Sequence, residues 1–315
     1  MTEVLLPPSK PPAEVADKAA VLRRLELDVT RRLDGLLSGD HRGVTGGPGT
    51  EPSGARPYGP GDDARRIDWC LTARALETHV RTTEADRELE TWIVADRSAS
   101  LDFGTADHEK RELVLAALAA FGFLGVRAGN RVGVLIAGGD RLARLPAVSG
   151  RHSLLASMSR VYDTPRQPSG PAQTSDLTAA LIQLERTQLR RGRVVVVSDF
   201  LDATNWTAPL SRLNLRHEVI TVQVTDPREL SLPPVGMLSV VDPETGRLLH
   251  VQTNSRRLRE RFAAAAEERQ SGIRQAIART GASYLHLSTD RDWLIDVVRF
   301  VGRRRVEHPS GAARR

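Results

Sequence analysis

Two short apolar segments that each stop at an aspartate constrain the fold of this chain most strongly. Residues 91–96 read Thr-Trp-Ile-Val-Ala-Asp, and residues 193–199 read Arg-Val-Val-Val-Val-Ser-Asp. Uninterrupted apolar runs of this length predict strands that are buried on both faces of a sheet. In an open parallel sheet, ligands bind at the carboxyl ends of the strands. We therefore expect Asp96 and Asp199 to lie together at that edge.

The rest of the chain alternates between predicted strands and predicted helices. Apolar strands are expected near residues 131–137, 217–224 and 284–287, with helical segments between them. This alternation predicts an α/β fold with a mostly parallel, doubly wound sheet that carries helices on both faces.

Two further features lie outside this alternation. Apolar residues recur at helical spacing between Ala13 and Leu37, which predicts one amphipathic N-terminal helical segment. Residues 237–241 and 247–251 flank a turn that contains glycine, and this pattern predicts a β-hairpin insertion.

Hydroxyl groups follow the first strand-end aspartate at alternate positions. The sequence Asp96-Arg-Ser98-Ala-Ser100 offers one carboxylate and two hydroxyls, all of them oxygen ligands that suit a hard cation such as Mg²⁺. Three such ligands bind a divalent ion weakly, so a further ligand such as Asp199 is needed. The alternative is structural, with Asp96 capping the next helix and the serines forming a turn.

The combined pattern resembles the metal-ion-dependent adhesion site of von Willebrand factor A (vWA) domains. That resemblance implies a middle ligand in a turn that opens a later helix, where this chain has Gln173-Thr174-Ser175-Asp176-Leu177. Ser175 aligns best with the middle ligand, and Thr174 is the alternative. The resemblance implies a site for Mg²⁺, or for Mn²⁺ or Ca²⁺, with five ligands: Asp96, Ser98, Ser100, Ser175 and Asp199.

A second stretch makes the resemblance more specific. Residues 58–74 contain Tyr58-Gly-Pro-Gly and a charged block that leads to Trp69, and Glu84-Ala-Asp-Arg-Glu88 follows. This stretch resembles the signature of the bacterial domain-of-unknown-function family fifty-eight, whose members carry a vWA-like domain and are commonly associated with MoxR-type AAA+ ATPases. The resemblance runs from about Gly35 to about Arg304.

The charged block within this stretch has two interpretations. It is either a second polar site beside the metal or an ion network that pins the segment to the sheet. Charges of alternating sign at this density usually satisfy one another, which favours the structural interpretation. The residues concerned are Asp62, Asp63, Arg65, Arg66 and Asp68.

These patterns together give a predicted domain organisation. It consists of a disordered tail at 1–13, the N-terminal helix with the family-specific segment at 14–87, the vWA-like domain at 88–302 and a basic tail at 303–315.

The resemblance implies a binding function rather than chemistry. It indicates a non-catalytic, metal-dependent adaptor that acts with a MoxR-type AAA+ ATPase on a client protein. The chain has no G-x-x-x-x-G-K-[ST] loop, so we do not expect it to hydrolyse ATP. A Mg²⁺-dependent phosphohydrolase similar to the haloacid dehalogenase group is the alternative, with Asp96 as nucleophile. For this chemistry the chain lacks an aspartate at position 98, and its Lys110 is predicted to lie inside a helix rather than at a strand end.

Composition bears on nucleic acid, membrane and compartment. The net charge is +6, but the basic residues are nearly all arginines and few aromatic residues accompany them, so binding of nucleic acid through the basic tail is not favoured. No apolar run reaches the roughly 18 residues of a membrane span. The first residues lack the pattern of a signal peptide, so we expect a cytoplasmic protein.

Overall fold

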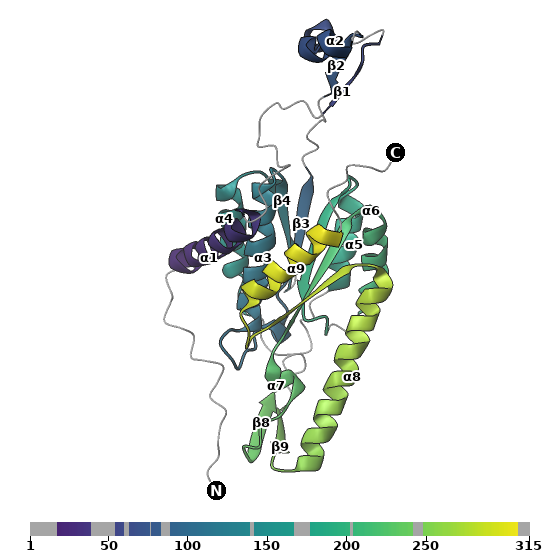
Figure 1. Cartoon of the computed structure of the whole chain (residues 1–315). Helices are drawn as coiled ribbons and strands as arrows, with labels where there is room; N and C mark the ends of the chain where they lie inside the picture. The colour runs from purple at the N-terminus through teal and green to yellow at the C-terminus, as the bar shows by residue number, and fades with distance from the viewer. Residues whose placement is uncertain are drawn as a thin grey trace. The chain divides into compact units, whose positions relative to one another are not determined.

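The computed structural model forms two compact units (Figure 1). The larger unit comprises Met1–Leu36 with Leu89–Arg315, and the smaller comprises Leu37–Glu88. The predicted disordered tail at 1–13 lies outside the described residues. The structure describes residues 18–38, 54–59, 63–75, 77–82, 89–138, 142–166, 177–201, 204–241 and 248–307.

A six-stranded sheet forms the centre of the larger unit. The strand order is β10-β7-β6-β3-β4-β5, and every neighbouring pair is parallel except β4 with β5. This sheet confirms the predicted mostly parallel α/β fold. Its strands are β3 (Glu90–Asp96), β4 (Arg131–Ala137), β5 (Ala143–Val148), β6 (Gly192–Ser198), β7 (Glu218–Thr225) and β10 (Ser283–Ser288).

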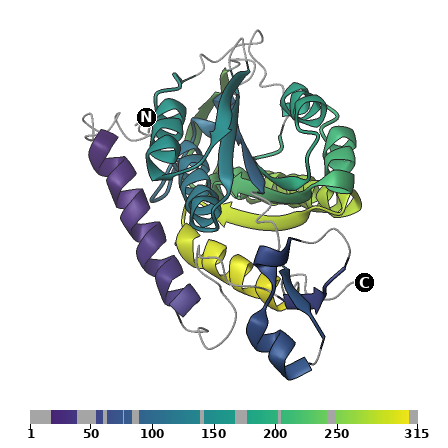
Figure 2. The ribbon, with the colours of Figure 1, turned by 90° about the horizontal axis from the view of Figure 1, so that it is seen from above.

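Helices cover both faces of this sheet, as Figure 2 shows from above. Side chains alternate along β3, so that Ile93 and Ala95 enter one core while Trp92 and Val94 enter the other. The sheet is therefore doubly wound, as predicted. One face carries α1 (Lys18–Ser38), α3 (Lys110–Arg127), α4 (Arg151–Tyr162) and α9 (Trp293–Glu307), and the other carries α5 (Leu177–Thr187), α6 (Thr207–Arg216) and α8 (Arg256–Thr280).

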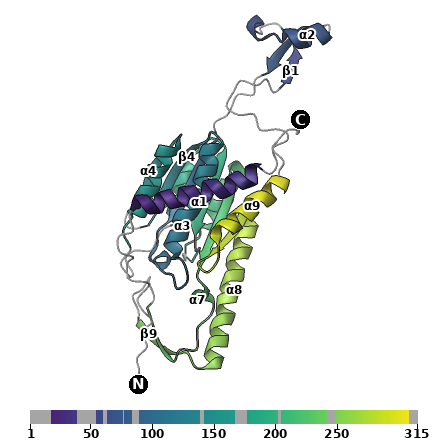
Figure 3. The ribbon, with the colours of Figure 1, turned by 60° about the vertical axis from the view of Figure 1, so that its left-hand side comes forward.

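The N-terminal helix α1 belongs to the larger unit. Its Leu22 and Val29 are buried in the core on the face that α3 and α9 also cover, and Figure 3 shows α1 on this face. Glu26 of α1 forms an ion pair with Arg151 of α4. The sequence-based division grouped this helix with residues 14–87, but its apolar face is buried against the α/β unit.

Elements of the smaller unit are short. Strands β1 (Gly54–Pro57) and β2 (His79–Thr82) pair antiparallel, and the helical turn η1 (Ala64–Arg66) and helix α2 (Trp69–Ala75) lie between them in sequence. Glycine and proline are frequent between His41 and Pro60, which predicts an irregular loop, but residues 54–57 form β1.

Three features of the larger unit complete the fold. Strands β8 (Met237–Val241) and β9 (Leu248–Gln252) form the predicted β-hairpin. The short helix α7 (Pro227–Leu230), which follows β7, was not predicted. Helix α9 continues to Glu307, so residues 303–307, assigned to the basic tail, are helical. Among the described residues, no helix is long and apolar enough to cross a membrane.

Close packing beside Trp92 gives a first prediction. A Cβ atom added to Gly133 on β4 would lie 2.7 Å from the Trp92 ring, which is 2 % exposed and cannot move aside easily. We expect Gly133→Ala to lower the free energy of unfolding by about 1–3 kcal/mol. The measurement is the urea unfolding midpoint at unchanged m-value.

Gly272 provides the matched control for this substitution. It lies exposed within α8, and a Cβ there meets nothing within 4 Å. Gly272→Ala should therefore raise the free energy of unfolding by about 0.5–1 kcal/mol, because alanine favours helix. Equal effects of the two substitutions would contradict the packing described for Trp92.

Candidate functional site

The carboxyl edge of the sheet has its topological switch point between β3 and β6. The chain passes from β3 to β4 on one side and from β6 to β7 on the other, and a crevice forms where such connections diverge. Asp96 ends β3, and Asp199 directly follows β6. The two predicted aspartates therefore lie at the same edge, on either side of this switch point.

Hydrogen bonds from two segments of the chain hold the Asp96 side chain in place. Its side chain is 1 % exposed, and its Oδ1 accepts a hydrogen bond from the backbone N–H of Ser98 at 2.9 Å. Its Oδ2 accepts one from Ser198 Oγ of β6 at 2.6 Å. These bonds fix the carboxylate across the β3 and β6 pair.

The two predicted serine ligands lie side by side. Ser98 Oγ and Ser100 Oγ are 3.0 Å apart. Ser98 precedes the helical turn η2 (Ala99–Leu101) but makes no side-chain capping bond to it. The alternative interpretation expected the serines to form a turn, and this turn is present, because Ser100 lies within η2 and Asp96 accepts from the backbone N–H of Ser98. Asp96 itself is not the N-cap of η2, which is Ser98.

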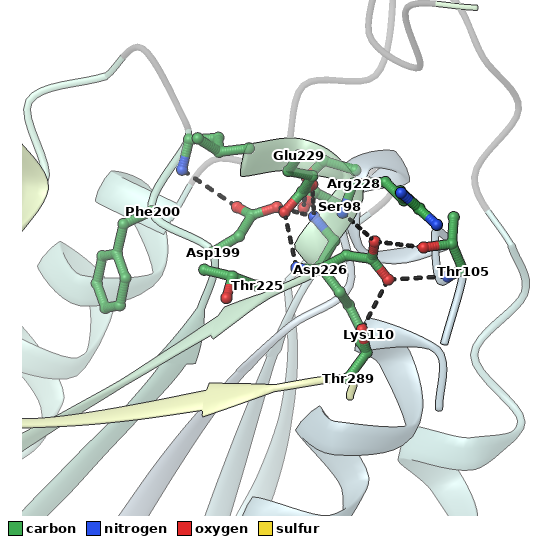
Figure 4. Close-up of polar contacts among 12 residues, drawn as sticks. Ser98, Thr105, Lys110, Asp199, Phe200, Thr225, Asp226, Arg228, Glu229 and Thr289 are labelled. Atoms are coloured by element: carbon green, nitrogen blue, oxygen red, sulfur yellow. Dashed lines mark hydrogen bonds and ion pairs between the residues drawn. The ribbon is translucent and has the colours of Figure 1, made fainter. Parts of the chain in front are cut away.

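Asp199 has a partner that the sequence did not suggest. Lys110 Nζ donates to Asp199 Oδ2 at 2.9 Å and to Glu229 Oε1 of α7 at 2.5 Å (Figure 4). The other Asp199 oxygen, Oδ1, accepts from the backbone N–H of Leu201 at 3.1 Å. Asp199 is thus bonded through both oxygens within the protein.

Lys110 is fully buried and still charged. Its side chain is 0 % exposed. Burial lowers the pKa of Lys110, but the carboxylates of Asp199 and Glu229 outweigh burial and hold that pKa above its ordinary value. Burial raises the pKa of Glu229. Lys110 therefore acts as a permanent positive charge at the carboxyl edge.

The prediction that Lys110 lies in a helix is confirmed, but the prediction that it lies away from the strand ends is wrong. It is the first residue of α3, the helix that follows β3. In a parallel sheet the helix after a strand begins at that strand's carboxyl edge, so its first residue can reach the site. This connection was the signal that could have located Lys110.

Asp226 forms a second buried cluster beside this one. It follows β7 and is 0 % exposed, and it accepts bonds from Thr105 N at 2.8 Å, Thr105 Oγ1 at 2.6 Å, Thr289 Oγ1 at 2.7 Å and Arg228 N at 2.9 Å (Figure 4). Burial raises the pKa of Asp226, but these hydrogen bonds outweigh burial and lower it overall. Asp226 thereby ties three connecting segments together at the carboxyl edge.

Sequence reasoning missed both Asp226 and Glu229, although they carry a local signal. Asp226-Pro-Arg-Glu229 places a capping aspartate three residues before a glutamate, with proline at the first helical position. In the structure the Glu229 side chain accepts from the backbone N–H of Asp226 at 3.1 Å, which completes a capping box.

A strained residue marks the end of β6. Phe200 has φ of 59°, and among the described residues it is the non-glycine residue with positive φ. Its backbone N–H donates to Ser198 Oγ at 2.9 Å, and its ring packs on Trp206 with centroids 5.0 Å apart. Strain of this kind is typical of functional sites and here keeps Ser198 and Asp199 in their positions.

Arg97 brings a second buried cation to this edge. It is 5 % exposed, and burial lowers its pKa to about 10. The charges that act on it include Arg111, Asp102 and Asp96, so cations and carboxylates are interspersed here.

Several of the other predicted site residues cannot be placed. Ser175, its alternative Thr174, Asp62 and the side chain of Arg66 lie outside the described residues. Within the part of the chain that is described, no group of three or more His, Cys, Asp or Glu residues could hold a metal ion. A metal centre at the carboxyl edge therefore depends on the serine hydroxyls.

Described members of the charged block serve the smaller unit as caps. Asp63 Oδ1 accepts from the backbone N–H of Arg65 at 3.0 Å and caps η1. Asp68 Oδ1 accepts from the backbone N–H groups of Cys70 and Leu71, each at 3.1 Å, at the start of α2. Asp63 and Arg65 are exposed, so these two do not belong to a buried ion network. Capping is a structural role within the smaller unit, and it differs from the predicted ion network with the sheet.

The sequence of the chain matches a known protein family. The family model described as "Protein of unknown function DUF58" matches residues 54–272. The chain belongs to this family. In this DUF58 protein the match includes the smaller unit's described elements and the carboxyl edge from β3 to α7, but it ends before β10 and Thr289.

Both sequence relatives and solved structures are similar to this chain, over different shares of its length. The DUF58 protein is 47 % identical over 304 residues to "Uncharacterized protein Rv1480" of Mycobacterium tuberculosis, covering 96 % of this chain and 95 % of that one. The crystal structure of conserved hypothetical protein BatB from Bacteroides thetaiotaomicron is 16 % identical, covers 68 % of this chain and 98 % of that chain, and has a TM-score of 0.44. The SpRpn10 VWA domain is 12 % identical, covers 67 % and 93 %, and has a TM-score of 0.38. The fold assignment itself rests on the strand order described above.

The lowered pKa of Asp226 predicts how the stability of the fold depends on pH. Its lowered pKa means that the ionised form contributes stability above the ordinary value of 3.8, and that this contribution is lost as pH falls through the folded-state pKa. We expect Asp226→Asn to lower the free energy of unfolding at pH 7 by about 2–3 kcal/mol. The difference from the unaltered protein should shrink below pH 3.8. Urea unfolding across this pH range measures both effects.

Asp28→Asn is the control for this titration. Asp28 is an exposed carboxylate on α1 that pairs with Arg24 at 3.7 Å. Its substitution should change the free energy of unfolding by less than about 0.5 kcal/mol at any pH. A difference for Asp226→Asn that stays constant from pH 7 to pH 3 would show that its charge is not what stabilises the fold.

Proposed function

We propose that this DUF58 protein is a non-catalytic, metal-dependent adaptor that binds other proteins through the carboxyl edge of its sheet. The observation that carries the proposal is the 3.0 Å separation of Ser98 Oγ and Ser100 Oγ. Neighbouring ligands of an octahedral Mg²⁺ with bonds of 2.0 to 2.1 Å are about 2.9 Å apart. The two hydroxyls are therefore spaced as adjacent ligands of one such ion.

The surrounding residues fit a divalent cation in chemistry and in charge. Ser98 and Ser100 would supply hydroxyl oxygens, and Asp96 and Asp199 would supply the carboxylates that balance the charge of the ion. Mg²⁺ suits such a set because it keeps several water ligands, and Mn²⁺ or Ca²⁺ accepts the same donors. When bound, the ion would offer an open coordination position to a carboxylate of a partner protein.

The proposed partner is a MoxR-type AAA+ ATPase, and the proposed task is remodelling or assembly of a client protein. Support comes from the resemblance given in the sequence analysis, which implies such a partner, and from the absence of an ATP-binding loop in the sequence. An ATPase partner needs ATP, which places the proposed complex in the cytoplasm.

One observation favours the phosphohydrolase alternative. Lys110 Nζ lies 2.9 Å from Asp199, so the carboxyl edge contains the lysine that this alternative had lacked. Two further observations weigh against it. Lys110 is fully buried between two carboxylates, and position 98 holds serine where that chemistry requires a second carboxylate. The adaptor therefore remains the better supported function.

Removing the two hydroxyls tests the proposed metal site. The Ser98→Ala, Ser100→Ala double variant loses two ligands that bond mainly to one another, so folding should be little affected. We expect its affinity for Mg²⁺ to fall by about tenfold or more and its free energy of unfolding to change by less than about 1 kcal/mol. Titration calorimetry with MgCl₂ measures the first quantity, and urea unfolding measures the second.

Ser211→Ala is the matched control, because Ser211 is a half-buried serine on α6 whose hydroxyl donates to Thr207 O. It should leave the Mg²⁺ affinity unchanged. If the double variant binds Mg²⁺ as tightly as this control, the serines are not ligands.

A paired assay separates the adaptor from the enzyme. A purified MoxR-type ATPase should be retained by the immobilised DUF58 protein in Mg²⁺, and should be lost with chelator or with the double serine variant. Hydrolysis of para-nitrophenyl phosphate by the unaltered protein, abolished by Asp96→Asn, would instead establish the phosphohydrolase. Retention of the ATPase that is equal with and without chelator would contradict a metal-dependent adaptor.

A further inference from the structure

Lys110 is the feature of the carboxyl edge that the proposed function does not use. A buried ammonium group is costly unless it is well paired, and this one is paired twice. Both of its acceptors are carboxylates at the ends of strands or just beyond them, Asp199 after β6 and Glu229 in α7. The same Asp199 is the carboxylate that a metal ion at Ser98 and Ser100 would draw on.

A divalent ion and the Lys110 ammonium are therefore alternatives for one carboxylate. Asp199 Oδ2 bonds Lys110 Nζ and Oδ1 bonds the backbone of Leu201, so binding a metal through Asp199 requires that one of these bonds be given up. The backbone bond closes the turn after β6. The bond to Lys110 is the one that an added cation can replace, because both serve to neutralise the same charge.

Glu229 makes this exchange feasible. Lys110 keeps its bond to Glu229 Oε1 when Asp199 turns toward a metal, so the buried ammonium is not left without a counter-charge. Glu229 is itself fixed by the capping box of α7, in which it accepts from the backbone N–H of Asp226. The second carboxylate thus holds the lysine in place in both arrangements.

We propose that Lys110 is an internal counter-cation that competes with the divalent ion for Asp199 and thereby sets the metal affinity of the site. This inference rests on the proposed metal site. It assigns to Lys110 a positioning role: the residue touches no ion itself, but it decides whether Asp199 is available to one. A site tuned in this way holds metal weakly by itself and gains from a ligand that a partner supplies.

The test is titration calorimetry of MgCl₂ into the full chain and its variants. Lys110→Met removes the competing ammonium at similar side-chain length, so Mg²⁺ should bind about tenfold more tightly or better. Lys110→Arg keeps the charge and should stay within about threefold of the unaltered protein. Circular dichroism without metal confirms that each variant is folded.

A double-variant comparison separates competition for Asp199 from a general charge effect. In an Asp199→Asn background, adding Lys110→Met should change the Mg²⁺ affinity by less than about twofold, because there is no carboxylate left to release. An equally large gain in that background would overturn the inference, since the lysine would then act by distant repulsion.

The other possible results of these titrations also support or overturn the proposed role of Lys110. Mg²⁺ binding by the unaltered protein with no gain in Lys110→Met overturns the role of Lys110 and leaves the proposed metal site standing. Binding by Lys110→Met alone supports the inference. No Mg²⁺ binding by either protein overturns both. Where Lys110→Met does not fold, the Lys110→Met, Glu229→Gln double variant removes the second unpaired carboxylate and should show the same gain.

Discussion

The carboxyl edge of this protein depends on one buried ion cluster, in which Lys110 is held between Asp199 and Glu229. The cluster joins the start of α3, the end of β6 and the short helix α7, which are far apart in the sequence. Removing one member of such a cluster leaves an uncompensated buried charge, whereas the intact cluster roughly offsets its own desolvation. The cluster therefore specifies how these three segments meet more than it adds to stability.

Beside that cluster, oxygen atoms suited to a divalent cation lie at the same edge of the sheet. Asp96 is oriented by bonds from Ser98 and Ser198, and the hydroxyls of Ser98 and Ser100 are adjacent. The strained backbone at Phe200 holds the end of β6 in the geometry that these contacts need. We interpret the edge as a pre-organised docking point whose ion and partner bind together.

The sequence predicted what is encoded locally. The buried strands and the β-hairpin follow from apolar runs and turn residues, and the structure contains each of them. Ser98 and Ser100 are adjacent, but the side chain that bonds Asp96 is Ser198, which the sequence did not suggest. The location of Lys110 was missed because the helix was treated separately from the strand that precedes it. The amphipathic pattern of residues 13–37 favoured docking on the domain over docking on a partner, and α1 does pack on the α/β unit. Such a pattern does not locate a domain boundary, so the sequence-based division grouped α1 with residues 14–87.

The most direct test of the metal site is anomalous diffraction from crystals of the protein grown or soaked with Mn²⁺, recorded near the manganese absorption edge. Our account predicts one strong anomalous peak within about 2.0 to 2.6 Å of both Ser98 Oγ and Ser100 Oγ, on the side of Asp96 and Asp199. A peak bound only by other residues, or none at these hydroxyls at saturating Mn²⁺, would contradict it.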